Sequence, residues 1–364
     1  MSIKYINEPL QIITPVPNGN YEVSLTINAM SDTTFSVTVQ NRRFVVMDQE
    51  IKRGEVKVFT FAVNVCDYHK SGEEYTECEN LIIEILCDGD ITAVSQISPA
   101  EIPTIYIAGD STVTDQYPAA YPYDPSHTYC GWGQMLPMLL DEKIAVSNHA
   151  QSGSCTKEFM ACNLLPFKDK IKKGDYLVVE FGHNDQKVAE LDAFGGYKKN
   201  LEYFISLARE KGAIPILTSP INRIIFNPDG TLLNLLGEYR NAVCEVSTEN
   251  NVTFIDLWSL TTDYWVKAGP VSAWDYFWSD GKGGRDYTHT NDIGGSIVAR
   301  MWANSLSATG LEAAAHIKRD LLSIPDPVYI AADSAGNEAE LEHIKNIGLV
   351  NVPEKLANLD KDLN

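Results

Sequence analysis

The stretch "YIAGDSTVTDQ", residues 106–116, decides the fold of the larger part of the chain. An apolar run ends here in a glycine, an acid and a serine, as a buried parallel strand does when it passes into a polar loop. Four more apolar runs of this kind follow, at residues 143–148, 175–182, 213–219 and 251–257. Because helical segments separate several of these runs, the pattern predicts an α/β fold with a parallel sheet covered on both faces.

Helical periodicity marks three segments of this region. Residues 196–212 place apolar side chains on one helical face and end in a glycine, a common helix stop. A second helix is expected after the turn sequence "NPDG". The last is expected over residues 291–306, with Asn291 or Asp292 as its N-terminal cap.

The first hundred residues have a different rhythm, in which apolar and polar residues alternate between polar turns. Residues 21–27 are an example, and no helical period interrupts the series. This pattern predicts an antiparallel β-sandwich over residues 1–100, joined by a proline-bearing segment to an α/β domain over residues 104–320. Residues 321–364 form a tail that the pattern does not place.

Composition excludes several classes of function. A net charge of −20 argues against nucleic acid and anionic membranes as partners, because both are bound by clustered Lys and Arg. No apolar run reaches the roughly 18 residues of a membrane span, and the first residues lack a secretory leader, so we expect a cytoplasmic protein. Seven scattered cysteines fit reduced thiols and have no metal-site spacing, so neither a metal nor another cofactor is expected. The sequence leaves open whether the chain is a monomer or a homo-oligomer.

Polar residues with complementary chemistry follow the predicted strands. The hydroxyl of Ser111 needs a base to become a nucleophile, and His289 is the leading candidate because Asp286, three residues earlier, can orient its imidazole. An oxyanion formed by serine attack needs preorganised donors. Gly153 and Asn184 lie at strand ends where they can supply such donors, together with the N–H of Ser111.

Four sequence blocks, "GDSTV", "NHAQSG", "GHNDQ" and "DYTH", resemble in this order the SGNH hydrolase superfamily, also called the GDSL esterases. The resemblance is closer to the rhamnogalacturonan acetylesterase branch, which has "GDSTV", "GWGQ" and "GHNDQK" in similar positions. It covers residues 104–305 and implies a flavodoxin-like three-layer α/β/α domain. It also implies that Ser111, Asp286 and His289 form a catalytic triad, and that the three donors named above form the oxyanion hole. The sandwich resembles one that precedes the catalytic domain in bacterial members.

The resemblance implies a serine esterase that removes O-acetyl groups from a carbohydrate through an acetyl-serine intermediate. The expected substrate is acetylated rhamnogalacturonan from pectin, as oligosaccharide or polysaccharide. Three alternatives stay open. The protein is another SGNH esterase acting on acetylxylan, aryl or lipid esters, a carbohydrate-binding protein with an inactive hydrolase domain, or a metal enzyme with His and Asp ligands.

Residues beside the four blocks are candidates for substrate binding. They are Trp132, His149, His183, Trp274, Trp278 and Arg285. The aromatic rings either stack on a sugar or pack a long loop onto the domain, and for the histidines loop orientation is the simpler interpretation. Lys187, Arg223 and Lys282 join Arg285 as candidates for binding a uronic acid carboxylate, although solvated surface is the simpler interpretation of each one.

Overall fold

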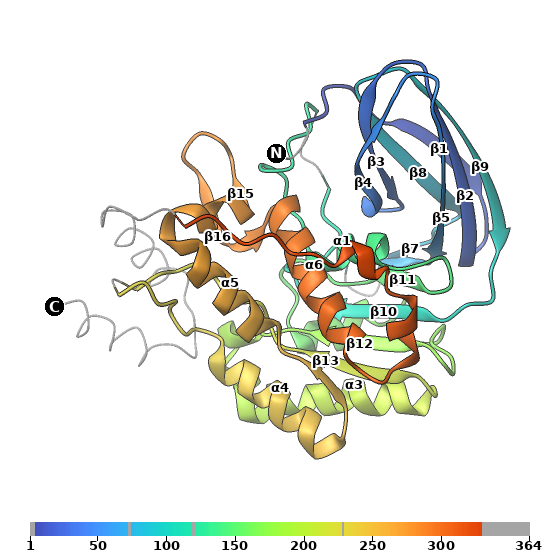
Figure 1. Ribbon diagram of the computed structural model, residues 1–364. Helices are drawn as coiled ribbons and strands as arrows, with labels where there is room; N and C mark the ends of the chain where they lie inside the picture. The colour runs from blue at the N-terminus through green and yellow to red at the C-terminus, as the bar shows by residue number, and fades with distance from the viewer. Residues whose placement is uncertain (1–3, 72–73, 118–120, 228, 330–364) are drawn as a thin grey trace.

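The computed structural model of the protein describes residues 4–71, 74–117, 121–227 and 229–329 (Figure 1). It contains an antiparallel β-sandwich followed by a parallel sheet with helices on both faces. Both parts of the predicted fold class are therefore confirmed. Among the described residues, no helix is long and apolar enough to cross a bilayer.

The sandwich consists of two antiparallel sheets and a small hairpin. One sheet has the strand order β1-β8-β3-β4, the other has the order β5-β2-β9, and β6 pairs with β7. The strands are β1 (Leu10–Pro15), β2 (Gly19–Ala29), β3 (Thr33–Val39), β4 (Arg43–Ile51), β5 (Val56–Val65), β6 (Tyr68–Ser71), β7 (Glu74–Thr76), β8 (Asn80–Cys87) and β9 (Ile91–Pro99). The alternation that predicts this region is the inside-outside pattern of β2, whose Val23, Leu25 and Ile27 are fully buried between the sheets.

The parallel sheet has the order β11-β10-β12-β13-β14. Its strands are β10 (Thr104–Gly109), β11 (Ala145–Asn148), β12 (Tyr176–Glu180), β13 (Ile214–Thr218) and β14 (Thr253–Ile255). Each of the five predicted apolar runs supplies one of them. The order is that of a flavodoxin-like sheet, in which the chain reverses direction beside the first strand and ligands bind at the carboxyl ends.

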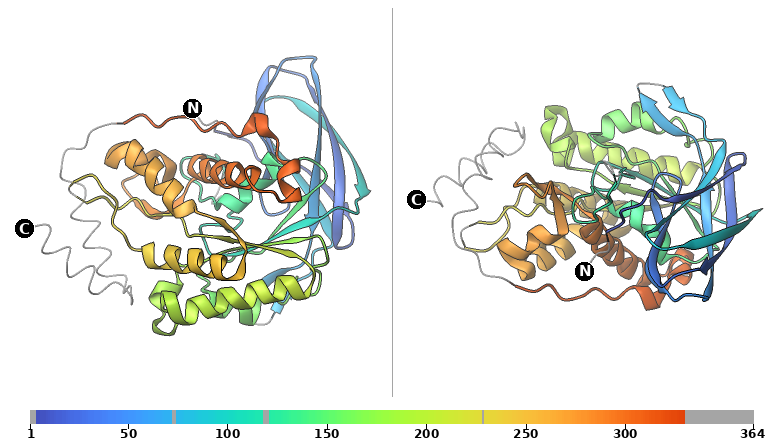
Figure 2. Two further views of the ribbon diagram at one scale, coloured as in Figure 1. Left: turned by 60° about the horizontal axis from the view of Figure 1, so that its bottom comes forward. Right: turned by 90° about the horizontal axis from the view of Figure 1, so that it is seen from above.

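Helices cover both faces of this sheet (Figures 1 and 2). They are α1 (Trp132–Met135), α2 (Thr156–Glu158), α3 (Lys198–Glu210), α4 (Gly237–Asn250), α5 (Leu257–Ser272) and α6 (Asp292–Ser307). Helices α3 and α4 pack on one face, and α1 and α6 on the other. As predicted, Asn291 caps α6, because its side chain accepts hydrogen bonds from the N–H groups of Ile293 and Gly294.

A short antiparallel hairpin precedes α6 and consists of β15 (Phe277–Ser279) and β16 (Arg285–Thr290). The sequence predicts a loop here, and the structure corrects that prediction. Asp286 and His289 lie on β16, so their spacing is fixed by paired strands.

The sandwich packs against the α/β domain through β4, which contacts α1, and through β5, which contacts β11. Tyr5, Phe44 and Leu86 from the sandwich belong to the same buried hydrophobic cluster as Ile105 on β10. The two parts of the chain therefore share one core at their junction.

Candidate active site

Three neighbouring strands deliver the predicted oxyanion donors to one edge of the sheet. Ser111 follows β10, Gly153 follows β11 and Asn184 follows β12. These residues line a cavity of about 470 Å³ together with Asp286 and His289 from the hairpin. The blocks that are far apart in the sequence thus meet where the sheet topology requires.

Ser111, His289 and Asp286 form a continuous hydrogen-bonded chain. Ser111 Oγ lies 2.7 Å from His289 Nε2, and His289 Nδ1 lies 2.7 Å from Asp286 Oδ2. Asp286 Oδ1 accepts hydrogen bonds from the backbone N–H groups of Thr288 (2.8 Å) and His289 (3.0 Å). Burial raises the pKa of Asp286, but these bonds, led by the one from His289, outweigh burial and hold the pKa below its usual range. An ionised Asp286 keeps the proton on Nδ1 and leaves Nε2 free to accept the serine proton.

Two further positions around Ser111 are suited to binding an oxyanion. Gly153 has φ of +80°, a conformation that side-chain-bearing residues rarely adopt. The side-chain NH₂ of Asn184 donates to Ser154 O (3.1 Å), while its Oδ1 accepts from Lys187 Nζ (3.0 Å). These two bonds fix which way the amide points, and its second N–H remains available to a ligand.

The segment "GWGQ" supports the Ser111 loop. A Cβ atom on Gly131 would lie 2.3 Å from the backbone carbon of Val113, so only glycine allows the loop to pack this closely. The Gln134 amide pairs with the backbone of Gln116, accepting from its N–H (3.1 Å) and donating to its carbonyl (2.8 Å). Gln116 Nε2 in turn donates to Ser111 O (3.2 Å), so the loop is held from both sides.

Four ionisable residues are buried behind the loops that carry Ser111 and Asn184, and we call them the floor, although only His183 among them lines the cavity itself. They are Asp110, Glu180, His183 and Asp185, each at most 2% exposed. Burial lowers the pKa of His183 to about 4, and burial raises the pKa of Glu180 to about 8 and that of Asp185 to about 7. At neutral pH the floor therefore holds a neutral histidine and a protonated glutamic acid.

The hydrogen bonds of Thr112 agree with a proton on Glu180. Thr112 Oγ1 lies 2.8 Å from Asp110 Oδ1 and 3.1 Å from Glu180 Oε1, but a hydroxyl has only one hydrogen to donate. If Glu180 carries a proton, it donates to Thr112, which donates to Asp110. Trp132 Nε1 donates to the other oxygen of Glu180.

Three cations form the wall of the cavity: Lys187, Arg223 and Arg285. Arg223 is 2% exposed, so the simpler interpretation of it as solvated surface is wrong. Its Nε donates to Thr288 Oγ1 (3.0 Å), whereas its Nη1 is buried and has no hydrogen-bond partner in the part of the chain that the structure describes. Within that same part, none of the three lies within 4.0 Å of a carboxylate oxygen. Lys282 does not line this cavity.

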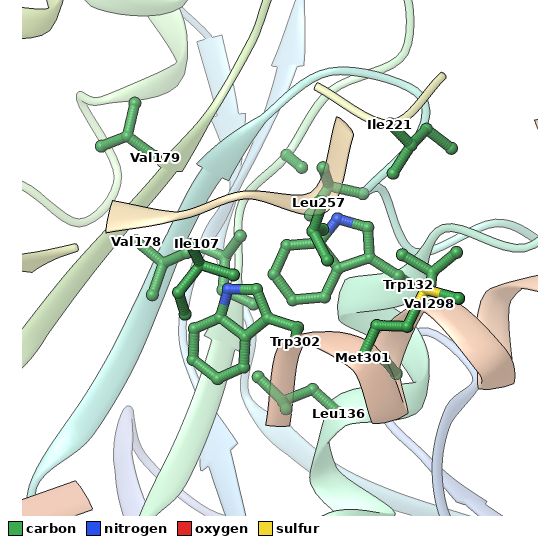
Figure 3. Close-up of a cluster of buried hydrophobic side chains, with 14 of the residues drawn as sticks. Ile107, Trp132, Leu136, Val178, Val179, Ile221, Leu257, Val298, Met301 and Trp302 are labelled. Atoms are coloured by element: carbon green, nitrogen blue, oxygen red, sulfur yellow. The ribbon is translucent and has the colours of Figure 1, made fainter. Parts of the chain in front are cut away.

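Trp132 and His149 are not substrate contacts, and the prediction for both is wrong. Trp132 is 0% exposed and stacks on Trp302 of α6 at 5.4 Å between ring centroids, within the apolar cluster of Figure 3. His149 is buried and stacks on Phe167 at 4.0 Å, with its Nε2 2.8 Å from Ser147 Oγ. Both residues lie within the quoted sequence blocks, but their side chains pack into the core.

The other predicted contacts divide between the cavity and its surroundings. His183 and Arg285 line the cavity, whereas Trp274 and Trp278 do not. Trp278 Nε1 donates to His127 O (2.8 Å), and the Trp274 ring lies 4.9 Å from the Arg285 guanidinium carbon. These two tryptophans hold the hairpin and its cation in place.

Sequence reasoning missed Tyr129, Gln116 and Ser152, which also line the cavity. Tyr129 stacks on Trp278 at 4.5 Å, meets His289 edge-on at 5.7 Å, and donates to Asp286 Oδ2 (3.4 Å). Gln116 and Ser152 lie within a few residues of Ser111 and Gly153, so proximity to those blocks was a usable signal. Tyr129 has no such signal.

Comparison with known proteins agrees with the geometry of this site. A model of the GDSL-like Lipase/Acylhydrolase family matches residues 107–305. Rhamnogalacturonan acetylesterase RhgT of Bacillus subtilis is 33% identical over 222 residues, which are 58% of this chain and 93% of that protein. The probable rhamnogalacturonan acetylesterase YesY of the same organism is 34% identical over 212 residues, 57% of this chain and 94% of that protein.

A solved structure resembles more of the chain. The crystal structure of the Bacillus subtilis protein YxiM superposes with a TM-score of 0.54 and 27% identity, covering 83% of this chain and 81% of that one. The matched family region contains all four blocks and the serine–histidine–aspartate chain. The protein therefore belongs to the GDSL-like lipase/acylhydrolase family and is a carboxylic ester hydrolase.

Proposed function

We propose that the protein is a serine esterase that removes O-acetyl groups from a carbohydrate, and that its substrate is acetylated rhamnogalacturonan. The acetylesterase names of two relatives at 33% and 34% identity support the acetyl-carbohydrate class. The observation that carries the finer substrate assignment is Arg223, a buried cation on the cavity wall whose Nη1 has no hydrogen-bond partner among the described residues.

In the first step, Ser111 Oγ attacks the acetyl carbonyl carbon while His289 Nε2 takes the hydroxyl proton. The carbonyl electron pair moves onto oxygen, and the N–H groups of Ser111 and Gly153 and the side chain of Asn184 stabilise that charge. The tetrahedral intermediate collapses as His289 gives its proton to the departing sugar oxygen. An acetyl-serine remains.

In the second step, His289 takes a proton from water, and the resulting hydroxide attacks the acetyl-serine carbonyl. Collapse of the new intermediate returns the proton to Ser111 Oγ and releases acetate. Asp286 stays ionised throughout and stabilises the imidazolium that forms twice in the cycle.

The charge of the cavity wall favours an acidic glycan. A chain of net charge −20 repels an anionic substrate, so a local cluster of cations is needed to bind one. Galacturonic acid in rhamnogalacturonan carries a carboxylate, which the planar Arg223 guanidinium can bind by charge-assisted hydrogen bonds. Acetylated xylan without uronic acid branches offers no such group.

Acetate release tests both parts of the proposal. Acetylated rhamnogalacturonan oligosaccharides, acetylated xylan and an aryl acetate are compared with the native protein and with Ser111→Ala. Preference for rhamnogalacturonan, abolished by the substitution, is the expected result. Serine-dependent release from the aryl acetate alone would retain the mechanism and reject the pectin substrate. Release unchanged in Ser111→Ala would reject the mechanism.

A further inference from the structure

The turn between β3 and β4 extends from the sandwich into the α/β domain. Its residues Gln40 and Arg42 have φ of 53° and 59°, a left-handed conformation that is uncommon for residues with side chains. Arg42 is 3% exposed although it lies on a turn. A buried charge at the tip of a turn needs specific partners, and this one has them in the other domain.

The Arg42 guanidinium donates to five residues of the α/β domain. These are Gln116 O (2.7 Å), Tyr123 Oη (2.8 Å), Tyr129 O (2.6 Å), Gln134 Oε1 (3.2 Å) and the Asp292 carboxylate (2.9 and 3.1 Å). A guanidinium has five N–H donors in a rigid plane, so one side chain can hold all these groups in a fixed arrangement.

The hydrogen bond from Arg42 to Gln116 connects Arg42 to the loop of Ser111. The carbonyl that Arg42 binds belongs to Gln116, and the side chain of that residue donates to Ser111 O and to Ser152 Oγ, each at 3.2 Å. Arg42 therefore fixes the loop that carries Ser111 and lines the cavity.

The hydrogen bonds from Arg42 to Asp292 and Tyr129 connect Arg42 to the surroundings of His289. Asp292 is the first residue of α6 and lies three positions after His289. Tyr129, whose carbonyl Arg42 binds, places its ring against His289 and its hydroxyl near Asp286. Arg42 is thus bonded to segments on both sides of the Ser111–His289 contact.

We propose that Arg42 is a positioning residue, and that through it the sandwich holds Ser111 and His289 in alignment for attack. The inference rests on the proposed roles of those two residues. Proton transfer requires the 2.7 Å contact between Ser111 Oγ and His289 Nε2, and small displacements of aligned groups are costly to the rate. RhgT aligns over 93% of its length to 58% of this chain, so that relative has no room for an equivalent of the whole sandwich.

Arg42→Lys tests the proposal, because lysine keeps a charge for Asp292 but cannot bond both loops at once. Arg43→Lys is the matched control. Arg43 is the next residue, the first of β4, and is also buried, but its partners, Asp115 (2.8 Å) and Val146 O (2.7 Å), do not connect to the histidine side. Activity is measured on an aryl acetate, so that recognition of the glycan does not contribute.

We expect Arg42→Lys to lower kcat by about 10- to 100-fold with KM within about twofold, and to slow labelling of Ser111 by a fluorophosphonate by a similar factor. Arg43→Lys is expected to change kcat by less than about threefold at a similar loss of thermal stability. A kcat for Arg42→Lys within twofold of native, or equal kcat losses in both variants, would overturn the proposal. An active Ser111→Ala in the same assay would instead overturn the proposed mechanism.

If Arg42→Lys does not fold, the double variant Arg42→Gln/Asp292→Asn takes its place. It removes both buried charges together, so that no carboxylate is left unpaired. The same loss of kcat is expected from a folded double variant, and native kcat in it would reject the positioning role.

Discussion

The acids of the cavity floor and the cations of its wall differ in whether they have bonding partners within the protein. On the floor, each acid is bonded within the protein: Asp110 and Glu180 to Thr112, and Asp185 to the N–H and hydroxyl of Thr156. On the wall, the cations have no carboxylate partner among the described residues. The acids already accept hydrogen bonds inside the protein and define the surroundings of Ser111, whereas cations that lack a carboxylate partner can bind an anionic ligand. The four predictions below test this division.

The largest effect is expected at Asn184, which lines the cavity and accepts a hydrogen bond from Lys187 of the wall. Asn184→Ala removes a donor to the developing oxyanion and should lower kcat by about 10²- to 10³-fold, with a smaller change in KM. Steady-state kinetics on an aryl acetate measures both values. Nearly full kcat in a folded variant would remove Asn184 from the oxyanion site.

The next effect concerns the wall. Arg223→Gln removes the buried charge but keeps a donor for Thr288. A charge-assisted hydrogen bond contributes about 1.5–3 kcal/mol, so kcat/KM on acetylated rhamnogalacturonan should fall by about 10- to 100-fold. Activity on the aryl acetate should stay within about threefold. Equal losses on both substrates would mean that Arg223 stabilises the hairpin through Thr288 and does not bind the glycan.

The floor predicts a pH effect on stability. Because burial raises the pKa of Glu180 from 4.5 to about 8, the folded protein keeps a proton that the unfolded chain has lost across that range. The free energy of unfolding therefore falls as pH rises, by about 1.4 kcal/mol per unit near pH 6 to 7 from this group. Urea unfolding of Glu180→Gln should show that slope reduced by about this amount. An unchanged slope would show that Glu180 is ionised in the folded state.

The smallest effect is expected at Arg285, which is exposed and lies over Trp274. Exposed charges contribute at most about 1 kcal/mol, so Arg285→Gln should raise KM for the acidic oligosaccharide by about two- to fivefold. Added salt should reduce this difference, because screening weakens exposed charges more than buried ones. A loss as large as that of Arg223→Gln would contradict the ranking of the two arginines by burial.

The parallel sheet and the order of the four blocks could be predicted because both depend on local sequence. Buried strands are continuous apolar runs, and their carboxyl ends must share one edge. The hairpin was missed because β16, "RDYTHT", contains few apolar residues. Helix α5 was missed because Thr261 is a buried position of its face, and Gly269 and Pro270 interrupt its last turns.

The direction of side chains was the harder problem. Trp132 and His149 lie within catalytic blocks but point into the core, because a position in a motif does not determine which way a side chain points. Arg42 shows no signal at all, since its partners come from segments up to 250 positions away. The cytoplasmic location and the absence of nucleic-acid and membrane partners stay predictions.

Arg42 in the turn and Arg43 at the start of β4 also limit how far the two domains can be exchanged as separate modules. Burial raises the pKa of Asp292 to about 6 and also raises that of Asp115, although Arg42 and Arg43 act against it. A chain cut before β10 would leave both acids without these cations, and each acid that stays buried would cost about 3–5 kcal/mol. Exchange of sandwiches between homologues would therefore have to transfer this turn together with its acceptors.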